Sequence, residues 1–363
     1  MVGFITKKSR ALLEEFDEAF SEAQILKCNR LVTVLERKAA KKSEAPRIDT
    51  EYGEYAEPGL HKELHSRKKE IAECRSDFAR VQQLKAALTA EEGWVNNKKE
   101  KNGHSIYYKK MSDSDLIMTK SHTFFECETK DIPELMIKLI ALFYETDLMT
   151  EYFPRRFMES HTMLHQVSRF SKITRIVLNF GRFVPVSKRT TMVIAKGFDL
   201  REEDSIMMTY ETKKGDSLNE EMNSNIHQFT RHSKRRSKES KMVEFFLRGC
   251  GFMVLVPGGV VFKHMSFFDL KFDFMPVFLM NLISSGIYAY EFADGIKKSV
   301  ERFAGTEWAK RVAENPAFYE DLRGRVEGFV EEGQDLYAEF SSVEKYFEEN
   351  RNVVDMKKLL GLK

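Results

Sequence analysis

The chain has 363 residues, of which 42% are hydrophobic and 31% are charged, and this length allows one large domain or two ordinary ones with a substantial core. Its net charge is only +2, so the chain as a whole lacks the basic character of a nucleic-acid-binding protein. Its four cysteines show no CxxC spacing, which argues against a zinc site and a disulfide framework and favours a reducing, cytoplasmic compartment.

The N-terminal part of the chain is expected to be helical. Residues 7–42 contain no Pro or Gly and carry apolar residues near a 3.6-residue period, which predicts one long helix. Charges begin at Lys7 with no apolar run before them, so we expect no secretory signal. Residues 46–59 mix Pro, Gly and Asp without a period and indicate a linker, and residues 60–90 predict a second helix. Two successive helices indicate a hairpin or a dimerisation arm.

Two histidines of the second helix have the spacing of metal ligands. His61 and His65 are four residues apart, so both would lie on one helix face. Their order is HxExH, not the HExxH of zinc proteases, and the sequence offers no third ligand beside them. We therefore expect a surface or packing role for this pair, and neither a metal nor another cofactor.

From Trp94 to Phe274 the pattern changes to about nine short strand-like stretches separated by turn residues. One helix interrupts them at 131–145, DIPELMIKLIALFYE, where Asp131 is placed to cap the first turn and Pro133 fits within it. A long antiparallel sheet with an early helix and another helix after its last strand is an α+β arrangement, not an alternating β-α-β fold.

The last predicted strand runs from Phe268 to Phe274, because Phe and Leu alternate there with charged residues. Residues 274–290 then carry no charge at all. This run is shorter than the roughly 18 to 20 residues that cross a bilayer, and it contains Pro276 and Asn281. We therefore expect a helix from Met275 to Phe303 that does not span a membrane.

The two faces of this last helix differ along its length. One face stays apolar to the helix end and is the better candidate for packing on the sheet; it carries Phe278, Leu282, Ser285, Ala289, Phe292, Ala293, Ile296, Val300 and Phe303. The opposite face is apolar in its first half and charged in its second. The first half therefore needs apolar surroundings on both sides, supplied either by a cavity and a membrane or by the sheet and the terminal helices.

Four stretches resemble, in their order along the chain, the START domain, which is the StAR-related lipid-transfer family of the Bet v 1-like superfold. They are GWVNNKKEKNGHSIYYKKMSDSDLIMTKSH, IPELMIKLIALFYETDLMTEYFPRRFMES, GRFVPVSKRTTMVIAKGF and FFDLKFDFMPVFLMNLISSGI. The resemblance covers roughly residues 90–303. It implies a START-like domain at 60–305, flanked by an N-terminal helix and linker at 1–59 and by a C-terminal helical extension at 306–363.

The fold that this resemblance implies is a curved antiparallel sheet around a hydrophobic cavity, closed by a C-terminal helix in a helix-grip arrangement. Pro154 keeps the proline of the family's Trp-Asp-Pro turn. Glu159 falls where many members have an acidic residue facing the cavity, and Arg175 or His161 could pair with it. The cavity arginine of the sterol-binding members is replaced by Ala195, so phospholipids, sphingolipids or other lipids are favoured over sterols.

The resemblance implies that the inner face of the sheet and the last helix bind the lipid. The expected lipid-binding residues are Glu159, His161, Ile176, Leu178, Thr191, Val193, Phe268, Leu270, Phe272, Phe278, Leu282 and Ile283. The expected membrane contacts are Met280, Ile287, Arg231, Lys234, Arg235 and Arg236. The last four belong to the basic run 231–241, in which each basic residue near an anionic leaflet contributes on the order of 1 kcal/mol, although the run could equally be a solvated loop.

The family is noncatalytic, and the sequence shows neither a GxSxG elbow nor a nucleotide-binding loop. We therefore expect a protein without enzymatic activity that binds one lipid or similar apolar molecule and transfers or senses it, peripherally, at membranes. The alternative is an interaction scaffold whose terminal helices dimerise or bind a protein partner while the START-like domain is structural or regulatory. A third hypothesis is a cavity enzyme of the same superfold.

Overall fold

The computed structural model describes residues 5–40, 58–90, 94–96, 104–110, 117–153, 157–181, 186–200, 205–212, 242–256, 258–271 and 287–338. Its helices are α1 (Lys7–Ser21), α2 (Ile25–Ala40), α3 (Pro58–Ser66), α4 (Lys68–Thr89), α5 (Ile132–Tyr144), α8 (Ile287–Glu301), α9 (Glu307–Glu314) and α10 (Pro316–Ala338). Two 3-10 turns, η1 (Thr129–Asp131) and η2 (Thr146–Glu151), flank α5.

The strands of the described residues form one sheet of ten strands in the order β1-β2-β3-β10-β9-β7-β6-β5-β4, with β8 beside β6. They are β1 (Val95–Asn96), β2 (His104–Lys110), β3 (Ile117–Glu126), β4 (Met158–Ser168), β5 (Ser171–Leu178), β6 (Arg189–Leu200), β7 (Ser205–Thr212), β8 (Val243–Glu244), β9 (Phe246–Val256) and β10 (Gly259–Asp269). Neighbours are antiparallel except for β6 and β8. The predicted α+β class, with an antiparallel sheet of about nine strands, is confirmed.

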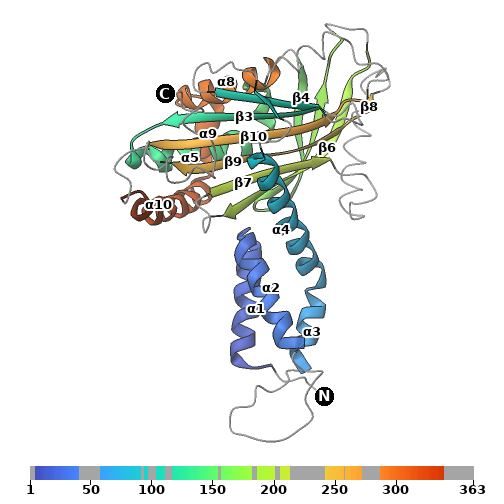
Figure 1. The fold of residues 1–363 in the computed structure, drawn as a ribbon, viewed down its shortest axis with the longest axis vertical. Helices are drawn as coiled ribbons and strands as arrows, with labels where there is room; N and C mark the ends of the chain where they lie inside the picture. The colour runs from blue at the N-terminus through green and yellow to red at the C-terminus, as the bar shows by residue number, and fades with distance from the viewer. Residues whose placement is uncertain are drawn as a thin grey trace, which may run out of the picture.

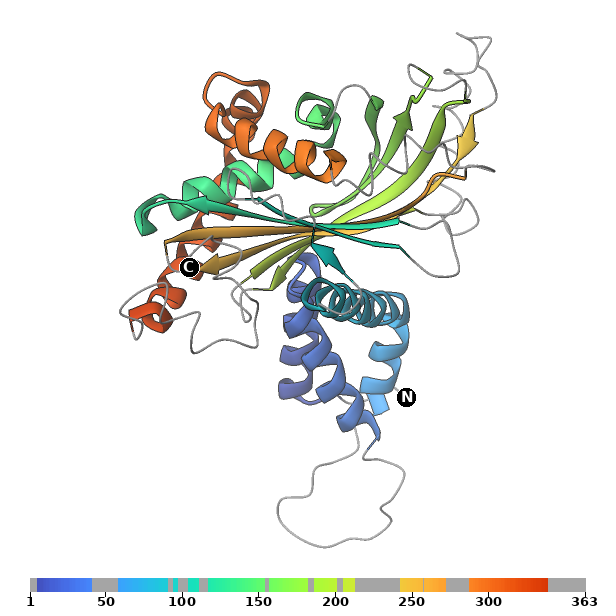
Figure 2. The same ribbon diagram turned by 45° about the horizontal axis from the view of Figure 1, so that its top comes forward.

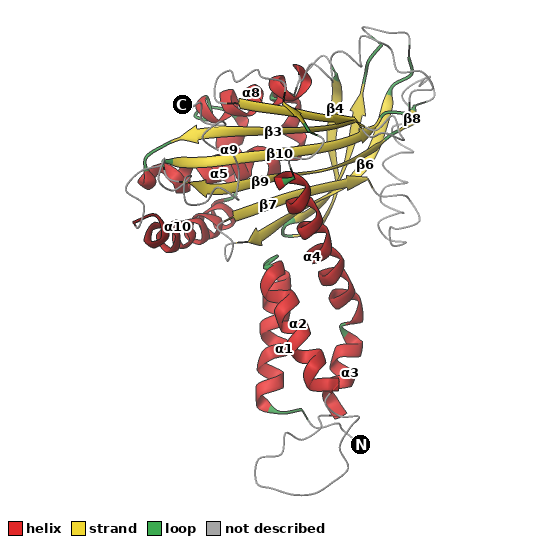
Figure 3. Ribbon diagram, in the orientation of Figure 1, coloured by secondary structure: helices red, strands yellow, loops and turns green. Residues whose placement is uncertain are grey.

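The sheet separates two helical layers (Figure 1). Figure 2 shows α5, α8 and α9 over the concave face, while α1 to α4 lie against the opposite, convex face. The register between β4 and β5 shifts at three places, and such bulges bend a strand pair, which contributes to the curvature. Figure 3 shows the same division, with helices on either side of one continuous sheet.

Strand periodicity assigns side chains to the two faces. On β6, Val193 is packed in the core on the concave side, whereas Phe198 and Leu200 belong to the core shared with α1 to α4. The convex core joins apolar residues of all four N-terminal helices to β3, β6, β7, β9 and β10. The N-terminal helices thus share one hydrophobic core with the sheet, across the boundary expected at residues 59 and 60; that division of the chain stays a prediction.

The single helix predicted at 7–42 is wrong, because the chain turns back between α1 and α2. Ala23 adopts φ 55°, in the left-handed region. The amide of Gln24 donates to the carbonyl of Ala19 at 2.9 Å, and that of Ala23 donates to Phe20 at 3.2 Å, which is the hydrogen-bond pattern of a Schellman helix end. Glycine usually occupies this position, so its absence removed the sequence signal.

The last strand ends earlier than predicted, because β10 ends at Asp269 and not at Phe274. The Lys271 amide donates to the Asp269 carboxylate at 3.0 Å, and Lys271 adopts φ 52°. This local side-chain hydrogen bond offers the backbone an alternative to the strand ladder. The chain therefore leaves the sheet before the alternating pattern of Phe and Leu is complete.

Candidate ligand cavity

A cavity lies between the concave face of the sheet and the helices above it. Strands β4 to β7, β9 and β10 form its floor, and α5, η2, α8 and α10 contribute its roof and one end. Its volume is about 220 Å³, whereas one water molecule needs only about 10–15 Å³ of such space. Most of its lining side chains are aliphatic or aromatic, including Phe153, Phe157, Ile206 and Phe292. The space is therefore suited to an apolar molecule larger than water.

Six of the expected lipid-binding residues do line this cavity: His161, Ile176, Leu178, Val193, Phe268 and Leu270. The structure thus brings together side chains from β4, β5, β6 and β10, and from the residue just after β10. Ala195 lines the same space, and its small side chain leaves room there. Whether these residues bind a lipid stays a prediction.

Two other expected residues lie elsewhere. The Glu159 side chain is 38% exposed and pairs with Lys188 at 2.7 Å, and it accepts from Asn179 at 2.8 Å. It is not among the residues that line the cavity, and Arg175 instead donates to Thr190 at 3.2 Å. Thr191 is buried next to Thr212, with 2.8 Å between their hydroxyl oxygens, and does not line the cavity.

The remaining expected site residues cannot be placed. Phe272, Phe278, Met280, Leu282, Ile283, Arg231, Lys234, Arg235 and Arg236 lie outside the described residues, and Ile287 is described only as the first residue of α8. The described half of the last helix nevertheless has the predicted inner face. Ala289, Phe292, Ala293, Ile296, Val300 and Phe303 are all buried. Within the described residues, none of the helices combines the length and apolar character that crossing a membrane requires.

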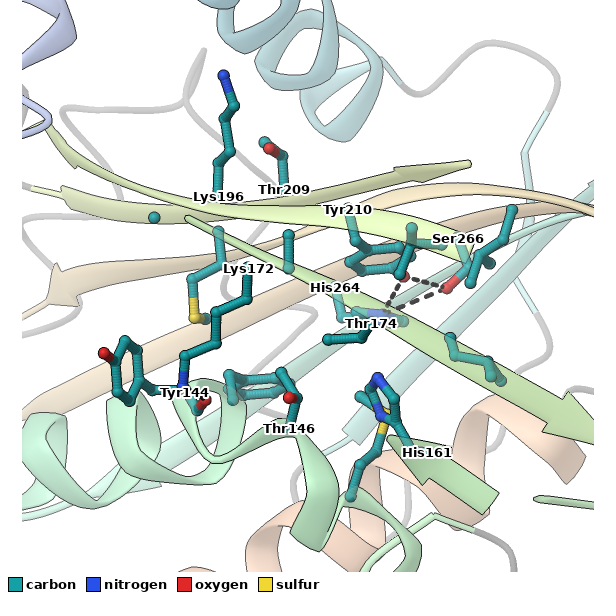
Figure 4. A pocket seen from close by; sticks show the side chains of 18 of the residues that line it. Tyr144, Thr146, His161, Lys172, Thr174, Lys196, Thr209, Tyr210, His264 and Ser266 are labelled. Carbon is teal, nitrogen blue, oxygen red and sulfur yellow. Dashed lines mark hydrogen bonds between the residues drawn. The ribbon is translucent and has the colours of Figure 1, made fainter. Parts of the chain in front are cut away.

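Three polar side chains at the floor of the cavity form hydrogen bonds with one another. Tyr210 Oη lies 2.8 Å from both His264 Nε2 and Ser266 Oγ, as Figure 4 shows. A Cβ at Gly249 would lie 2.3 Å from this phenol oxygen, so glycine allows Tyr210 to cross β9 toward β10. Burial lowers the pKa of His264 to about 3, so its imidazole is neutral at physiological pH.

A second set of three polar side chains lies nearer η2, and each of them has an atom without a hydrogen-bond partner. Thr146 on η2, His161 on β4 and Thr174 on β5 line the cavity, and Figure 4 shows their side chains in one region of it. Their atoms Thr146 Oγ1, His161 Nε2 and Thr174 Oγ1 are buried without a hydrogen-bond partner. Burial lowers the pKa of His161 to about 4, and Asp147 opposes this shift only in part.

The lysine of the cavity wall is held by neighbouring groups. Lys172 Nζ donates to the Tyr144 carbonyl at 2.7 Å and lies 3.4 Å from the centroid of the Tyr144 ring. Burial lowers the pKa of Lys172 to about 8, which leaves it mostly charged at neutral pH. The carbonyl and the ring together therefore stabilise this ammonium group at the cavity wall.

One end of the cavity is closed by elements far apart in the sequence. Glu22 of the α1–α2 turn and Phe318, Leu322 and Arg325 of α10 all contribute to the lining there. Glu22 pairs with Arg325 and with Arg169 of the β4–β5 turn, and Asp321 pairs with the same two arginines. These four charged side chains, here named the clasp, connect the N-terminal helices, the sheet and α10.

Five polar residues of the cavity were not predicted from the sequence: Thr146, Thr174, Tyr210, His264 and Ser266. On β10 a signal was present, because His264 and Ser266 alternate with Lys263 and Met265 and so share a face with Phe262 and Phe268. For Thr146 there was none, because it lies on the 3-10 turn after α5, where no periodicity applies.

No protein-family model and no curated protein sequence matches the chain. Among solved structures, human STARD10 is similar with a TM-score of 0.47 and 11% identity over 64% of this chain and 82% of that one. Human StAR-related lipid transfer protein 5 has a TM-score of 0.43 and 11% sequence identity, over 62% of this chain and 98% of that one. A STAR-related lipid transfer protein fragment from Xanthomonas axonopodis has a TM-score of 0.42 and 12% sequence identity, over 58% of this chain and 99% of that one. Two of these three solved structures are named as StAR-related lipid transfer proteins, the family that the sequence resembles, and all three match with a TM-score below 0.5.

Proposed function

We propose that this protein binds one lipid, or a similar apolar molecule, in the cavity and transfers or senses it at membranes. The observation that supports this most directly is the cavity itself, a space lined mainly by apolar side chains between the sheet and α5, α8 and α10. Solid packing normally fills a domain core to high density with few voids larger than a water molecule, so a cavity of this size favours a guest.

Catalysis in the cavity is less well supported than binding. The one hydroxyl–imidazole–hydroxyl arrangement described there joins Ser266, His264 and Tyr210. A general base is most effective when its pKa lies near the working pH, and burial holds the pKa of His264 at about 3. This imidazole is therefore a poor proton acceptor at neutral pH and serves better as a fixed hydrogen-bonding group.

The scaffold hypothesis has less support from the described residues. The apolar residues of α1, α2 and α4 are largely used in the core that they share with the convex face of the sheet. Val34 of α2 is an exposed exception, and single exposed apolar residues are normal on protein surfaces. Membrane contact through 231–241 and 275–287, and a protein partner for the terminal helices, stay predictions.

The proposal can be tested by filling the cavity. Ala195→Trp should remove the guest because the indole would occupy the space that Ala195 leaves open, whereas Ile194→Trp places the same group on the opposite face of β6. We expect delipidated wild-type protein to take up one lipid per chain from mixed liposomes, measured by native mass spectrometry. Ala195→Trp should reduce uptake more than tenfold with its melting temperature preserved, and Ile194→Trp should not.

Two results would contradict the proposal. One is a folded wild-type protein that stays empty when it is offered sterols, phospholipids and sphingolipids. The other is equal uptake by wild type and a folded Ala195→Trp variant, since that would place any bound lipid outside this cavity.

A further inference from the structure

Three polar side chains share one region of the cavity, and each has a buried polar atom without a hydrogen-bond partner. The residues Thr146, His161 and Thr174 are 5%, 7% and 0% exposed, and they come from η2, β4 and β5. Neither hydroxyl nor the Nε2 atom of His161 makes a hydrogen bond within the protein. We name this group the Thr-His-Thr cluster. It contrasts with the Tyr210–His264–Ser266 group, whose members satisfy one another.

The cluster has an energetic cost unless a guest or a trapped water molecule completes its hydrogen bonds. Each buried polar atom without a hydrogen bond costs about 1–3 kcal/mol, and native structures leave few such atoms. Three of them in one region of a cavity that could hold more than a single water molecule therefore point to a hydrogen-bonding group on the guest.

The chemistry of the cluster favours an uncharged group on the guest. Threonine hydroxyls both donate and accept, and burial keeps His161 neutral by lowering its pKa to about 4. His161 Nδ1 lies 3.1 Å from Met149 Sδ, which only accepts, so the proton belongs on Nδ1. Nε2 then becomes an acceptor that requires an O–H or N–H donor from the guest.

An anionic head group fits this region poorly. The carboxylate or phosphate of a buried lipid would need a positive partner, because moving an unpaired charge out of water is costly. The cation on the same face of β5 is Lys172, and its Nζ already donates to the Tyr144 carbonyl at 2.7 Å and lies over the Tyr144 ring. An ionised oxygen also has no proton to give to His161 Nε2.

We infer that the Thr-His-Thr cluster binds the uncharged, hydroxyl- or amide-bearing head group of a long-chain lipid, such as a diacylglycerol, and selects it over anionic lipids with the same chains. This inference rests on the proposed lipid-binding function and adds the chemical class of the ligand. His161 Nε2 accepts a hydrogen bond from the head-group O–H or N–H, while Thr146 and Thr174 complete the hydrogen bonds of the remaining head-group oxygens.

The test compares lipids that differ only in the head group. Vesicles of dioleoylphosphatidylcholine would carry equal amounts of dioleoylglycerol and dioleoylphosphatidate, and native mass spectrometry would measure which lipid the protein extracts. We expect at least a tenfold preference for dioleoylglycerol. Thr174→Val and His161→Phe should reduce that preference to below threefold, because they remove the hydrogen bonds and keep the packing volume similar.

Thr209→Val is the matched control. Thr209 also lines the cavity, and its Oγ1 is also buried without a partner. Figure 4 shows that its side chain points away from His161, on the other side of β7 from Tyr210. This variant should therefore keep the full preference for dioleoylglycerol. Uptake of an uncharged hydrocarbon probe, 1-pyrenyldodecane, should remain in all three variants and would show that their cavities are intact.

The outcomes separate this inference from the proposed function. Extraction of both lipids without preference, or a preference that Thr174→Val and His161→Phe leave unchanged, would overturn the inference and leave lipid binding in place. A preference for dioleoylphosphatidate would overturn it as well. Failure to take up any lipid or the hydrocarbon probe would overturn both proposals.

Discussion

His264 illustrates how burial fixes the state of a single residue. Its ring stacks between polar and aromatic neighbours, with the Phe292 ring centroid 4.4 Å away and Tyr210 Oη 2.8 Å from Nε2. An imidazolium would lose its hydration there without gaining an acid partner among these neighbours, which is why burial lowers its pKa to about 3. The neutral ring belongs to the folded state, whereas the unfolded chain titrates near the ordinary value.

This difference predicts that acid destabilises the fold through His264. Between pH 7 and pH 5 the unfolded chain binds nearly one proton at this residue, whose ordinary pKa is 6.5, while the folded protein binds almost none. The free energy of unfolding should therefore fall by about 2 kcal/mol from this residue as the pH decreases over that range. This destabilisation is absent at pH values above the pKa of His264 in the unfolded chain, and it stops growing below the pKa of His264 in the folded protein.

Urea denaturation of wild type and His264→Gln at pH 7 and pH 5 measures this effect. The glutamine variant should lose about 2 kcal/mol less stability between the two pH values, whatever its stability at pH 7. His65→Gln, which replaces an exposed histidine of α3, is the control and should keep the wild-type pH dependence. Parallel pH profiles for wild type and His264→Gln would show that the folded protein does bind a proton here.

At the scale of secondary structure, the position of α8 over the cavity depends on a close backbone contact. A Cβ at Gly295 would lie 2.2 Å from the carbonyl oxygen of Tyr152, at the end of η2. Around this contact, the Tyr152 and Phe292 rings pack with centroids 5.9 Å apart. A side chain at this position would therefore push α8 away from the residues that roof the cavity.

We predict that Gly295→Ala lowers the free energy of unfolding by about 1–3 kcal/mol, because a backbone carbonyl cannot move aside as a flexible side chain can. Gly324→Ala in α10 is the matched control, since no atom lies within 4 Å of its added Cβ. In an open helical position this change should stabilise by about 0.5–1 kcal/mol. Chemical denaturation of both variants checks the prediction, and equal effects of the two substitutions would refute it.

Sequence patterns predicted strands better than helix breaks, for a physical reason. Successive side chains of a strand point to opposite faces, so Ile176 and Leu178 of β5 share a face, and together with Val193 of β6 they line the cavity. That these residues bind a lipid stays a prediction. The α1–α2 turn depends on a left-handed alanine held by backbone hydrogen bonds, and alanine gives no such signal. The Thr-His-Thr cluster arises from η2, β4 and β5 meeting in space, which no local pattern records.

At the scale of the whole molecule, the terminal helices belong to the architecture of the cavity. Tyr319 Oη of α10 donates to Glu145 at 2.8 Å, and the Phe318 and Tyr144 rings stack with centroids 4.5 Å apart. The segment expected to be a C-terminal extension thus supplies part of the cavity lining, together with the α1–α2 turn. Opening this end would require the clasp, formed by Glu22, Arg169, Asp321 and Arg325, to separate.

Because the clasp consists of ion pairs, we predict that salt weakens the docking of α10 at this end of the cavity. Its side chains are partly exposed, so dissolved ions screen their attraction, and the Debye length falls from about 10 Å at 0.1 M to about 3 Å at 1 M salt. Partly exposed ion pairs contribute about 0.2–1 kcal/mol each. Glu22 makes one such pair directly with α10, through Arg325, and its second pair holds Arg169 of the β4–β5 turn. Glu22→Gln should therefore weaken the docking of α10 by about 1 kcal/mol, which corresponds to roughly fivefold faster local opening.

Amide hydrogen exchange of residues 316–326 measures this opening directly. Wild type should exchange faster at 1 M than at 0.1 M sodium chloride. Glu22→Gln should already exchange faster than wild type at 0.1 M and respond less to added salt, because only the Arg169–Asp321 pair of the clasp then still joins α10 to the sheet. Lys130→Gln is the control, since Lys130 and Glu128 form a largely exposed pair outside the clasp. If Glu22→Gln exchanged like wild type at low salt, the two ion pairs of Glu22 would have no part in closing the cavity, and α10 would be held by its other contacts, such as the Tyr319–Glu145 hydrogen bond.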